Sequence, residues 1–288
     1  MRAKQTLVRL AATHWPFANG SGRIIDRLGA GLDFGSGERV VRTSDGFDIT
    51  VWADDHIGRH ILLSGSFDRA IVGVLLDFCE EGDQIVDVGA NIGYVSCVLL
   101  QRVPRSRVLS IEPQPGIAAL LEANLSRFPK ERWTRLQAAL SDAEASGSLQ
   151  LNRKNRGASR LVSGPADGTV QVPMLPAGRV LGQLERLDIM KMDIEGHEEA
   201  VFRAARDTLA RLQPRAILFE DELGNAHPEG PIGSVLNACG YRVFGLRKTL
   251  TATTLEPVTA ASSRTFHDYV AVSRTRPLPG RAVRRYGL

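Results

Sequence analysis

Short runs of apolar, often β-branched residues recur along the middle of the chain and alternate with stretches in which apolar residues have helical spacing. Such runs predict buried strands, and the stretches between them predict helices that pack on those strands. The alternation favours an α/β fold, with a doubly wound, mostly parallel sheet covered by helices on both faces. The predicted core strands lie at 84–88, 107–111, near 134–138, 187–192, 216–219, near 241–246 and near 267–272.

The rest of the chain predicts extensions to this single core domain. Residues 1–45 read as an N-terminal appendage, in which a basic amphipathic helix is followed by glycine-rich turns. The core domain spans 46–275, and 276–288 form a basic tail. Because the sequence from Arg274 onward is rich in Arg, Pro and Gly, disorder is predicted there.

Two segments of the core domain lie outside the regular alternation. Short strands at 47–52 and 60–63 and a helix at 67–79 are predicted ahead of the first core strand. Between the third and fourth strands, residues 149–174 contain several glycines and predict a hairpin or a lid-like insertion near a pocket.

Composition and charge narrow the range of functions. With 288 residues, 43% of them hydrophobic, the chain can bury one large core. No apolar run approaches a membrane span, and no signal-peptide core begins the sequence. The odd number of cysteines, each within an apolar pattern, argues against disulfides and a zinc site, so a cytoplasmic protein without a metal is predicted. The oligomeric state is not predicted.

The net charge of +4 is concentrated in two basic clusters. A protein that wraps nucleic acid usually has a broad basic face with interleaved aromatic residues, whereas only 6% of this chain is aromatic. The charge pattern therefore argues against a nucleic-acid partner. The clusters are Arg153, Lys154, Arg156 and Arg160, and Arg274, Arg276, Arg281, Arg284 and Arg285.

The segment 85–96, which reads IVDVGANIGYVS, predicts a strand that leads through a glycine loop into a helix. Such a loop can hold a nucleoside-bearing ligand at the helix N-terminus. Asp87 lies at the strand end, and Gly89 lets the backbone approach a ligand closely. Asn91 tolerates a left-handed conformation, and Gly93 allows tight packing of the helix on the sheet. The spacing differs from the dinucleotide fingerprint, which favours a smaller ligand than a pyrophosphate.

Glu112 follows the second core strand, roughly 20 residues after the glycine loop, where a βαβ unit places a carboxylate beside a ribose. A carboxylate accepts hydrogen bonds from both ribose hydroxyls. A solvated glutamate at a strand end is the alternative, but the joint spacing of loop and carboxylate favours the nucleoside site.

The sequences DVGANIG at 87–93 and KMDIEGHE at 191–198 resemble two motifs of the FkbM methyltransferase family, within the class I S-adenosylmethionine-dependent methyltransferases. The resemblance covers residues 60–275. It implies a Rossmann-like methyltransferase domain, S-adenosylmethionine as cofactor, and O-methylation of a hydroxyl on a sugar or small natural product. ALSD at 139–142 resembles the adenine-side motif of the family. The implied cofactor-binding residues are Asp87, Gly89, Ala90, Asn91, Gly93, Glu112, Ser141, Asp142 and Asp193.

Lys191, Asp193 and Glu195 are spaced by two, so an extended chain points them to one side, at the strand end that opens on the cofactor. An alcohol acceptor must lose a proton, and Asp193 and Glu195 are the candidate catalytic carboxylates, with Lys191 orienting them. Simple neutralisation of Asp193 is the alternative role for Lys191. His197 is a second candidate base.

Several alternatives remain open from the sequence. A carboxylate cluster of Asp193, Glu195, Glu220 and Asp221 is able to hold Mg²⁺, although no spacing demands a metal. Methylation of RNA or another nucleic acid is the alternative activity, but the segment after the fourth strand lacks the Pro-Pro-aromatic loop of amino-methyltransferases. A non-catalytic partner protein that binds the methyl donor is the alternative of another class. The basic loop from Arg153 suggests an anionic acceptor, or a loop whose charges only aid solubility.

Overall fold

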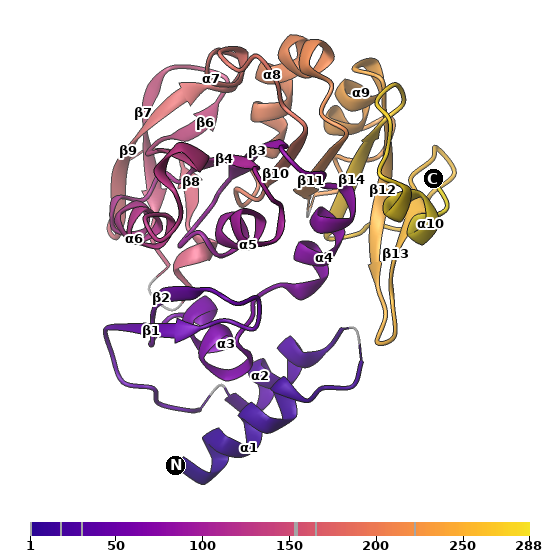
Figure 1. Ribbon diagram of the computed structural model, residues 1–288. Coiled ribbons are helices and arrows are strands. Elements are labelled where there is room, and N and C mark those ends of the chain that lie inside the picture. Colours follow the sequence, from indigo (N-terminus) through magenta and orange to yellow (C-terminus); the bar gives the residue numbers. More distant parts are fainter. Residues whose placement is uncertain (1, 18, 30, 153–154, 165, 222) are drawn as a thin grey trace.

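The computed structural model describes residues 2–17, 19–29, 31–152, 155–164, 166–221 and 223–288. Its centre is an eight-stranded sheet with the strand order β13-β12-β14-β11-β10-β3-β4-β5 (Figure 1). Neighbouring strands from β11 to β5 are parallel, whereas β14 is antiparallel to both of its neighbours. The predicted doubly wound, mostly parallel sheet is therefore confirmed. The strands are β3 (Gln84–Val88), β4 (Arg107–Ile111), β5 (Trp133–Leu136), β10 (Ile189–Met192), β11 (Ala216–Glu220), β12 (Tyr241–Lys248), β13 (Thr253–Pro257) and β14 (Asp268–Ser273).

Helices cover both faces because successive residues of a buried strand point in opposite directions. On β10, Ile189 belongs to an apolar cluster that includes residues of three helices next to the sheet, among others, and Met190 belongs to a second cluster that includes residues of three different helices. The first set is α4 (Arg69–Phe78), α5 (Tyr94–Arg102) and α6 (Pro115–Leu125), and the second is α7 (Ala177–Gly182), α8 (Glu198–Leu212) and α9 (Pro231–Ala238). Both faces of the central strands are apolar, so these strands are buried between helical layers.

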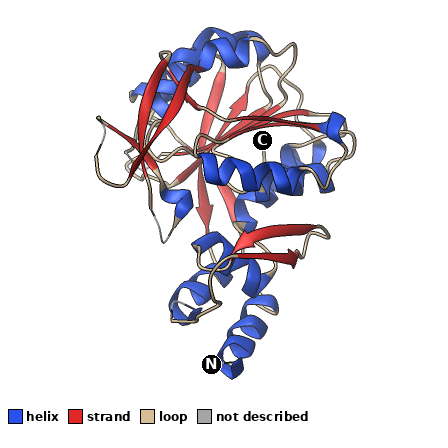
Figure 2. Cartoon of the chain, turned by 90° about the vertical axis from the view of Figure 1, so that its left-hand side faces the viewer, coloured by secondary structure: helices blue, strands red, loops and turns tan. Residues whose placement is uncertain are grey.

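The N-terminal part forms a small lower layer of the molecule (Figure 2). It contains α1 (Arg2–Thr13), α2 (Ser21–Gly29), the antiparallel pair β1 (Glu38–Arg42) and β2 (Asp48–Trp52), and α3 (His56–Ser64). The strand predicted at 60–63 is wrong, because this segment lies in α3. The side chain of Asp55 caps the N-terminus of that helix by accepting from the Ile57 backbone N at 3.1 Å, and Gly65 ends the helix in a left-handed conformation.

The insertion between β5 and β10 folds into a second sheet with the order β6-β9-β7-β8. Its elements are β6 (Ala139–Ser141), β7 (Ala145–Gln150), the 3₁₀ turn η2 (Arg156–Ala158), β8 (Arg160–Val162) and β9 (Thr169–Pro176), and another 3₁₀ turn, η1 (Lys130–Arg132), precedes β5. The predicted hairpin is thus part of a larger unit. Residues 139–150 supply two of its strands, which the sequence pattern did not reveal.

The basic tail is ordered, contrary to the disorder predicted from its composition. It ends in α10 (Gly280–Tyr286), where Ala282 is buried and the Tyr286 ring stacks on Phe78 of α4 at 5.9 Å between ring centroids. The Tyr286 hydroxyl donates to Asp77 at 2.8 Å. One aromatic ring with an apolar partner therefore fixes a segment whose overall composition is typical of disorder.

The predicted division at residues 45 and 275 stays a prediction. No helix among the described residues is both long and apolar enough to cross a membrane.

Candidate active site

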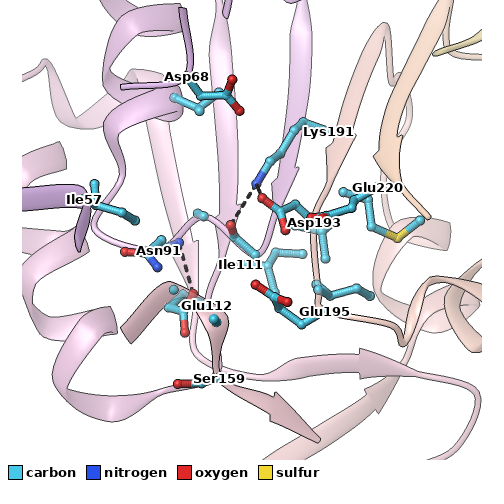
Figure 3. A pocket seen from close by; sticks show the side chains of 18 of the residues that line it. Ile57, Asp68, Asn91, Ile111, Glu112, Ser159, Lys191, Asp193, Glu195 and Glu220 are labelled. Atoms are coloured by element: carbon cyan, nitrogen blue, oxygen red, sulfur yellow. Dashed lines mark hydrogen bonds and ion pairs between the residues drawn. The ribbon is translucent and has the colours of Figure 1, made fainter. Parts of the chain in front are cut away.

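A cavity of about 510 Å³ opens at the carboxyl ends of the parallel strands. Gly89 follows β3, Glu112 follows β4, Asp193 follows β10 and Glu220 ends β11, and all four line the cavity. This is the position at which open α/β sheets bind ligands. In Figure 3, Asn91 and Glu112 lie on one side of the pocket, and Asp193 and Glu195 lie on the opposite side.

The loop after β3 has the left-handed conformations that its sequence predicts. Gly89, Asn91 and Gly93 have φ angles of 72°, 51° and 86°. Packing within the protein also requires the two glycines: a Cβ on Gly89 would overlap the backbone carbonyl of Asp193, and one on Gly93 would lie 2.6 Å from Leu121. Gly89 therefore lets the loop touch the end of β10, and it also lines the cavity, so its predicted close approach to a ligand stays a prediction.

The Glu112 side chain connects the loop after β3 to the segment after β4. Its Oε2 accepts a hydrogen bond from the Asn91 backbone N at 3.0 Å, and its Oε1 accepts one from the Gln114 backbone N at 2.9 Å. Burial raises the pKa of Glu112 to about 7, although both backbone donors act against this shift. Each carboxylate oxygen can accept a further hydrogen bond, and Glu112 lines the cavity, so it is able to receive two hydroxyl donors of a ligand.

Lys191 joins β10 to β3 beneath the pocket. Its Nζ donates to the Gly89 carbonyl at 2.9 Å and lies 3.4 Å from Asp193 Oδ2 and 3.5 Å from Asp87 Oδ1. Burial lowers the pKa of Lys191, but the two carboxylates outweigh this effect and hold the pKa above its usual value. Asp87 is fully buried and also accepts from the Ser96 hydroxyl at 2.7 Å. Asp87 does not line the cavity, so we assign it the role of stabilising the loop after β3 through Lys191 and Ser96.

Asp193 and Glu220 form a carboxyl pair with different protonation. Burial would raise the pKa of Asp193, but the Lys191 ammonium and a hydrogen bond with Glu220 lower it. Burial raises the pKa of Glu220 to about 7, against the hydrogen bond from His267, whose Nε2 lies 2.7 Å from Glu220 Oε1. Asp193 is therefore ionised at neutral pH, and Glu220 donates a hydrogen bond to it in its protonated form.

Glu195 lines the cavity just beyond the end of β10. It has a φ of 55°, which is uncommon for a residue with a side chain, and Gly196 follows with a φ of 92°. The strand β10 ends at Met192, so the chain is no longer extended at Glu195. The prediction that the spacing by two points Glu195 to the same side as Lys191 therefore lacks its basis. The three predicted catalytic residues nevertheless line one cavity.

The other sequence candidates lie beside the cavity or apart from it. His197 lines it and shares a hydrogen bond of 2.9 Å with the Ser141 hydroxyl, and burial lowers its pKa. Asp142 binds Arg203 at 2.6 Å, which lowers the Asp142 pKa. Ser141, Asp142 and Gly93 do not line the cavity, so their predicted contact with a cofactor stays a prediction.

The carboxylate cluster considered for Mg²⁺ is not assembled in the described structure. Asp221 turns away and accepts hydrogen bonds from the backbone N atoms of Leu223 at 3.1 Å and Ala226 at 2.6 Å. Within the described part of the chain, Asp193, Glu195 and Glu220 belong to no group of side chains that converge on a metal position.

Four charged residues of the pocket were missed by the sequence interpretation. Lys248 lies 2.7 Å from Asp268 and 3.9 Å from Asp68, and the two carboxylates raise its pKa against the effect of burial. Desolvation raises the pKa of Asp68 to about 6. Hydrogen bonds to Asp268 and Glu220 raise the pKa of His267 to about 11. These residues lie outside the two motifs, and no spacing along the chain connects them.

The insertion overhangs the pocket, as predicted. Gly157 of η2 packs so closely on the loop after β3 that a Cβ there would lie 2.9 Å from Asn91 Nδ2. The Arg156 backbone N donates to Asp55 at 2.9 Å, its guanidinium lies 3.3 Å from Asp54, and the same group stacks on Trp52 at 4.7 Å. Arg156 of the basic loop therefore already has two acidic partners within the protein. Arg153 and Lys154 lie outside the described residues.

Comparison with known proteins identifies the family. Residues 87–243 match the model of the methyltransferase FkbM domain, and this match includes both motifs and the carboxyl ends of β3, β4, β10 and β11. The chain belongs to the FkbM methyltransferase family. The family prediction is thereby confirmed.

Relatives of this FkbM-family protein are distant. The chain is 25% identical over 162 residues to hexuronic acid methyltransferase AglP of Haloferax volcanii, covering 56% of this chain and 64% of that protein. It is also 25% identical over 162 residues to 2-O-methyltransferase NoeI of Sinorhizobium fredii, covering 50% of this chain and 64% of the relative. The matches thus span somewhat less than two thirds of either relative. A solved precorrin-6y C5,15-methyltransferase from Geobacter metallireducens is similar with a TM-score of 0.42 and 15% identity, over 72% of this chain and 89% of that one. The fold assignment rests on the strand order instead.

The cofactor of this family is S-adenosylmethionine, as predicted. The pocket fits it in two respects. A buried carboxylate, Glu112, retains acceptor capacity toward the cavity, and the 510 Å³ volume lies within the range of small-molecule sites.

Proposed function

We propose that this protein is an S-adenosylmethionine-dependent O-methyltransferase that acts on a hydroxyl group of a sugar or small natural product. The observation that carries the proposal is the distribution of carboxylates around one cavity: Glu112 faces Asp193 and Glu195 across it (Figure 3). One wall suits the ribose of the donor, and the other suits an acceptor that must lose a proton.

Each wall has a distinct chemical task in this proposal. Glu112 would hold the ribose, with the backbone of Gly89, Ala90 and Asn91 around the rest of the donor. Bound S-adenosylmethionine supplies a methyl group activated by its sulfonium, whose thioether leaving group needs no proton. The remaining requirements are alignment of the acceptor hydroxyl and removal of its proton.

Glu195 is the proposed base, and Asp193 is the proposed orienting carboxylate. Asp193 is ionised and held by Lys191 and Glu220, so its geometry is fixed and its basicity is low. Glu195 lines the same side of the cavity in a left-handed turn that the flexible Gly196 follows. A fixed carboxylate suits positioning, and a carboxylate on the adjoining turn suits proton transfer.

The choice of a carbohydrate hydroxyl draws on the relatives, whose names specify a hexuronic acid methyltransferase and a 2-O-methyltransferase. An anionic acceptor remains part of the proposal with weaker support, because Arg156 already pairs with Asp54 and Asp55. The insertion that carries Arg156 would close the acceptor side of the pocket.

The test is calorimetric titration with S-adenosylmethionine, followed by a donor-turnover assay against neutral sugars, hexuronic acids and small polyols. Binding of the donor with turnover on a hydroxylated acceptor is expected. Donor binding without turnover on these acceptors or in cell extract would contradict the enzymatic part and favour a non-catalytic binding protein. Methyl transfer to a nitrogen or carbon of the acceptor would contradict the O-methylation.

A further inference from the structure

Three potential metal ligands meet between helices α2 and α3 of the N-terminal layer, apart from the carboxylates described above. Asp26 comes from α2, and His56 and His60 lie one turn apart on α3. Asp26 Oδ1 lies 2.8 Å from His60 Nε2 and 3.8 Å from His56 Nδ1, and one ligand atom of each residue lies within 4.8 Å of the others. The two imidazole rings are 4.5 Å apart between centroids.

These separations suit a small divalent ion. Zn²⁺ binds imidazole nitrogen and carboxylate oxygen at about 2.0–2.1 Å, so two ligand atoms of a tetrahedral site lie about 3.3 Å apart. The two measured distances to Asp26 lie on either side of this value, and small side-chain rotations would equalise them. Two imidazoles and one carboxylate are a donor set that zinc-class transition ions prefer, whereas Mg²⁺ and Ca²⁺ prefer oxygen.

The accessibility of the cluster is also suitable. The side chain of His60 is only 9% exposed, whereas those of His56 and Asp26 are 32% and 49% exposed. One ligand is thus held rigidly inside, and two face an opening through which an ion and its water ligands can enter.

A hydrogen bond between Asp26 and His60 that merely ties α2 to α3 is the simpler explanation of two of the three residues. It does not account for His56, which brings a second ring nitrogen to the same carboxylate oxygen without forming a hydrogen bond of ordinary length. Phe67 packs its ring edge-on against both imidazoles, at 6.2 Å and 5.7 Å between centroids, which restricts their orientation.

We propose that Asp26, His56 and His60 bind one divalent transition-metal ion of the zinc class. The ion links α2 to the neighbouring α3 (Figure 1) and lies at the rim of the donor pocket, which His56 also lines. With three protein ligands, a tetrahedral ion keeps one position for water. Its role is to fix α2 against α3 and thereby the pocket rim, and the methyl-transfer chemistry does not require it.

The site can be tested without any activity assay. The full chain is freed of metal with a chelator, dialysed, and titrated with Zn²⁺ in competition with a chromophoric chelator. We expect one equivalent to bind, and a rise in the melting temperature in excess Zn²⁺, because an ion that binds only the folded state stabilises it. Co²⁺ at the same site is expected to give the visible absorption of a four-coordinate N/O site.

Single-residue variants separate this site from other zinc ligands. His56→Ala and Asp26→Asn change the two more exposed ligands, and each is expected to weaken Zn²⁺ binding at least tenfold and to abolish the thermal shift. His14→Ala removes an exposed histidine outside the cluster and is the matched control, which should bind as the unaltered protein does. Circular dichroism of each variant verifies folding. Failure of the unaltered protein to bind one equivalent would overturn the proposal, as would equal affinity in all variants, which would assign binding to the cysteines or to other histidines.

Discussion

The ribose assignment of Glu112 makes the most direct prediction about donor binding. Glu112→Ala removes a carboxylate that lines the cavity and has one acceptor position left on each oxygen. A hydrogen bond to a charged group contributes about 1.5–3 kcal/mol. Loss of one such net interaction lowers donor affinity roughly 10- to 150-fold, and loss of two independent interactions sets the upper limit.

The same substitution also frees two backbone N–H groups, of Asn91 and Gln114, so a collapsed loop has to be distinguished from a lost contact. The pH dependence of the unaltered protein does this. Because the pKa of Glu112 is raised to about 7, the carboxylate is ionised above that pH and becomes protonated below it. Donor affinity should therefore fall as the pH is lowered from 8 to 6. This dependence should become weaker in Glu112→Ala, in which Glu220 and Asp68 are the pocket carboxyl groups that still titrate in this range.

Calorimetric titration of S-adenosylmethionine at several pH values is the assay, with urea unfolding of each variant as a measure of stability. Glu122→Ala on the surface of α6, where the side chain contacts only Arg135 among the described ion pairs, is the control. A change in donor affinity of less than twofold in Glu112→Ala would refute the ribose assignment. An affinity that falls in Glu112→Ala but shows no pH dependence in the unaltered protein would indicate loss of loop structure instead.

Three further substitutions test the rest of the site. Glu195→Gln preserves shape but removes basicity, so turnover should fall about 100-fold or more while calorimetric donor affinity stays the same; loss of both would move Glu195 to the donor site. Lys191→Met leaves the buried Asp87 without its cation and should lower the free energy of unfolding by about 3–5 kcal/mol in urea, and an unchanged value would mean that this ion pair contributes nothing to stability. Arg156→Ala removes the side-chain contacts of the lid with Asp54 and Asp55 but keeps the backbone hydrogen bond to Asp55, and it should raise the KM for the acceptor with little change in stability; an unchanged KM would mean that these side-chain contacts do not position the lid for the acceptor.

The core strands and the main site were accessible from local sequence. The β-branched residues of 84–88 predict the strand. The short polar side chain of Asn91 permits its positive φ. Both features depend on only a few neighbouring residues. Glu112 and Asp193 could be placed because parallel strands end at one edge of a sheet. The positions of the strand ends were thus sufficient to predict that these carboxylates line one cavity.

The errors have a common physical origin. The segment 60–63 has an apolar run that suits either a strand or a helix, and the cap at Asp55 and the left-handed Gly65 decide for the helix. Had that helix been expected, His56 and His60 would have appeared as an i, i+4 pair on one face, which is a recognised metal-ligand spacing. The ordered tail depends on Tyr286 finding Phe78, a contact that average composition does not reveal.

By itself, the sequence determined the alternation of strands and helices, the glycine loop and the acidic residues at the strand ends, because these depend on short-range preferences and on a sheet geometry common to parallel folds. Only the tertiary structure decided what those groups contact. In the folded protein, Gly89 packs against the backbone carbonyl of Asp193, and the buried Asp87 pairs with Lys191. The tertiary structure also brought Lys248 and His267 into the pocket from the far end of the chain. Contacts and pKa values depend on distances between residues remote in sequence, and those distances exist only once the core has packed.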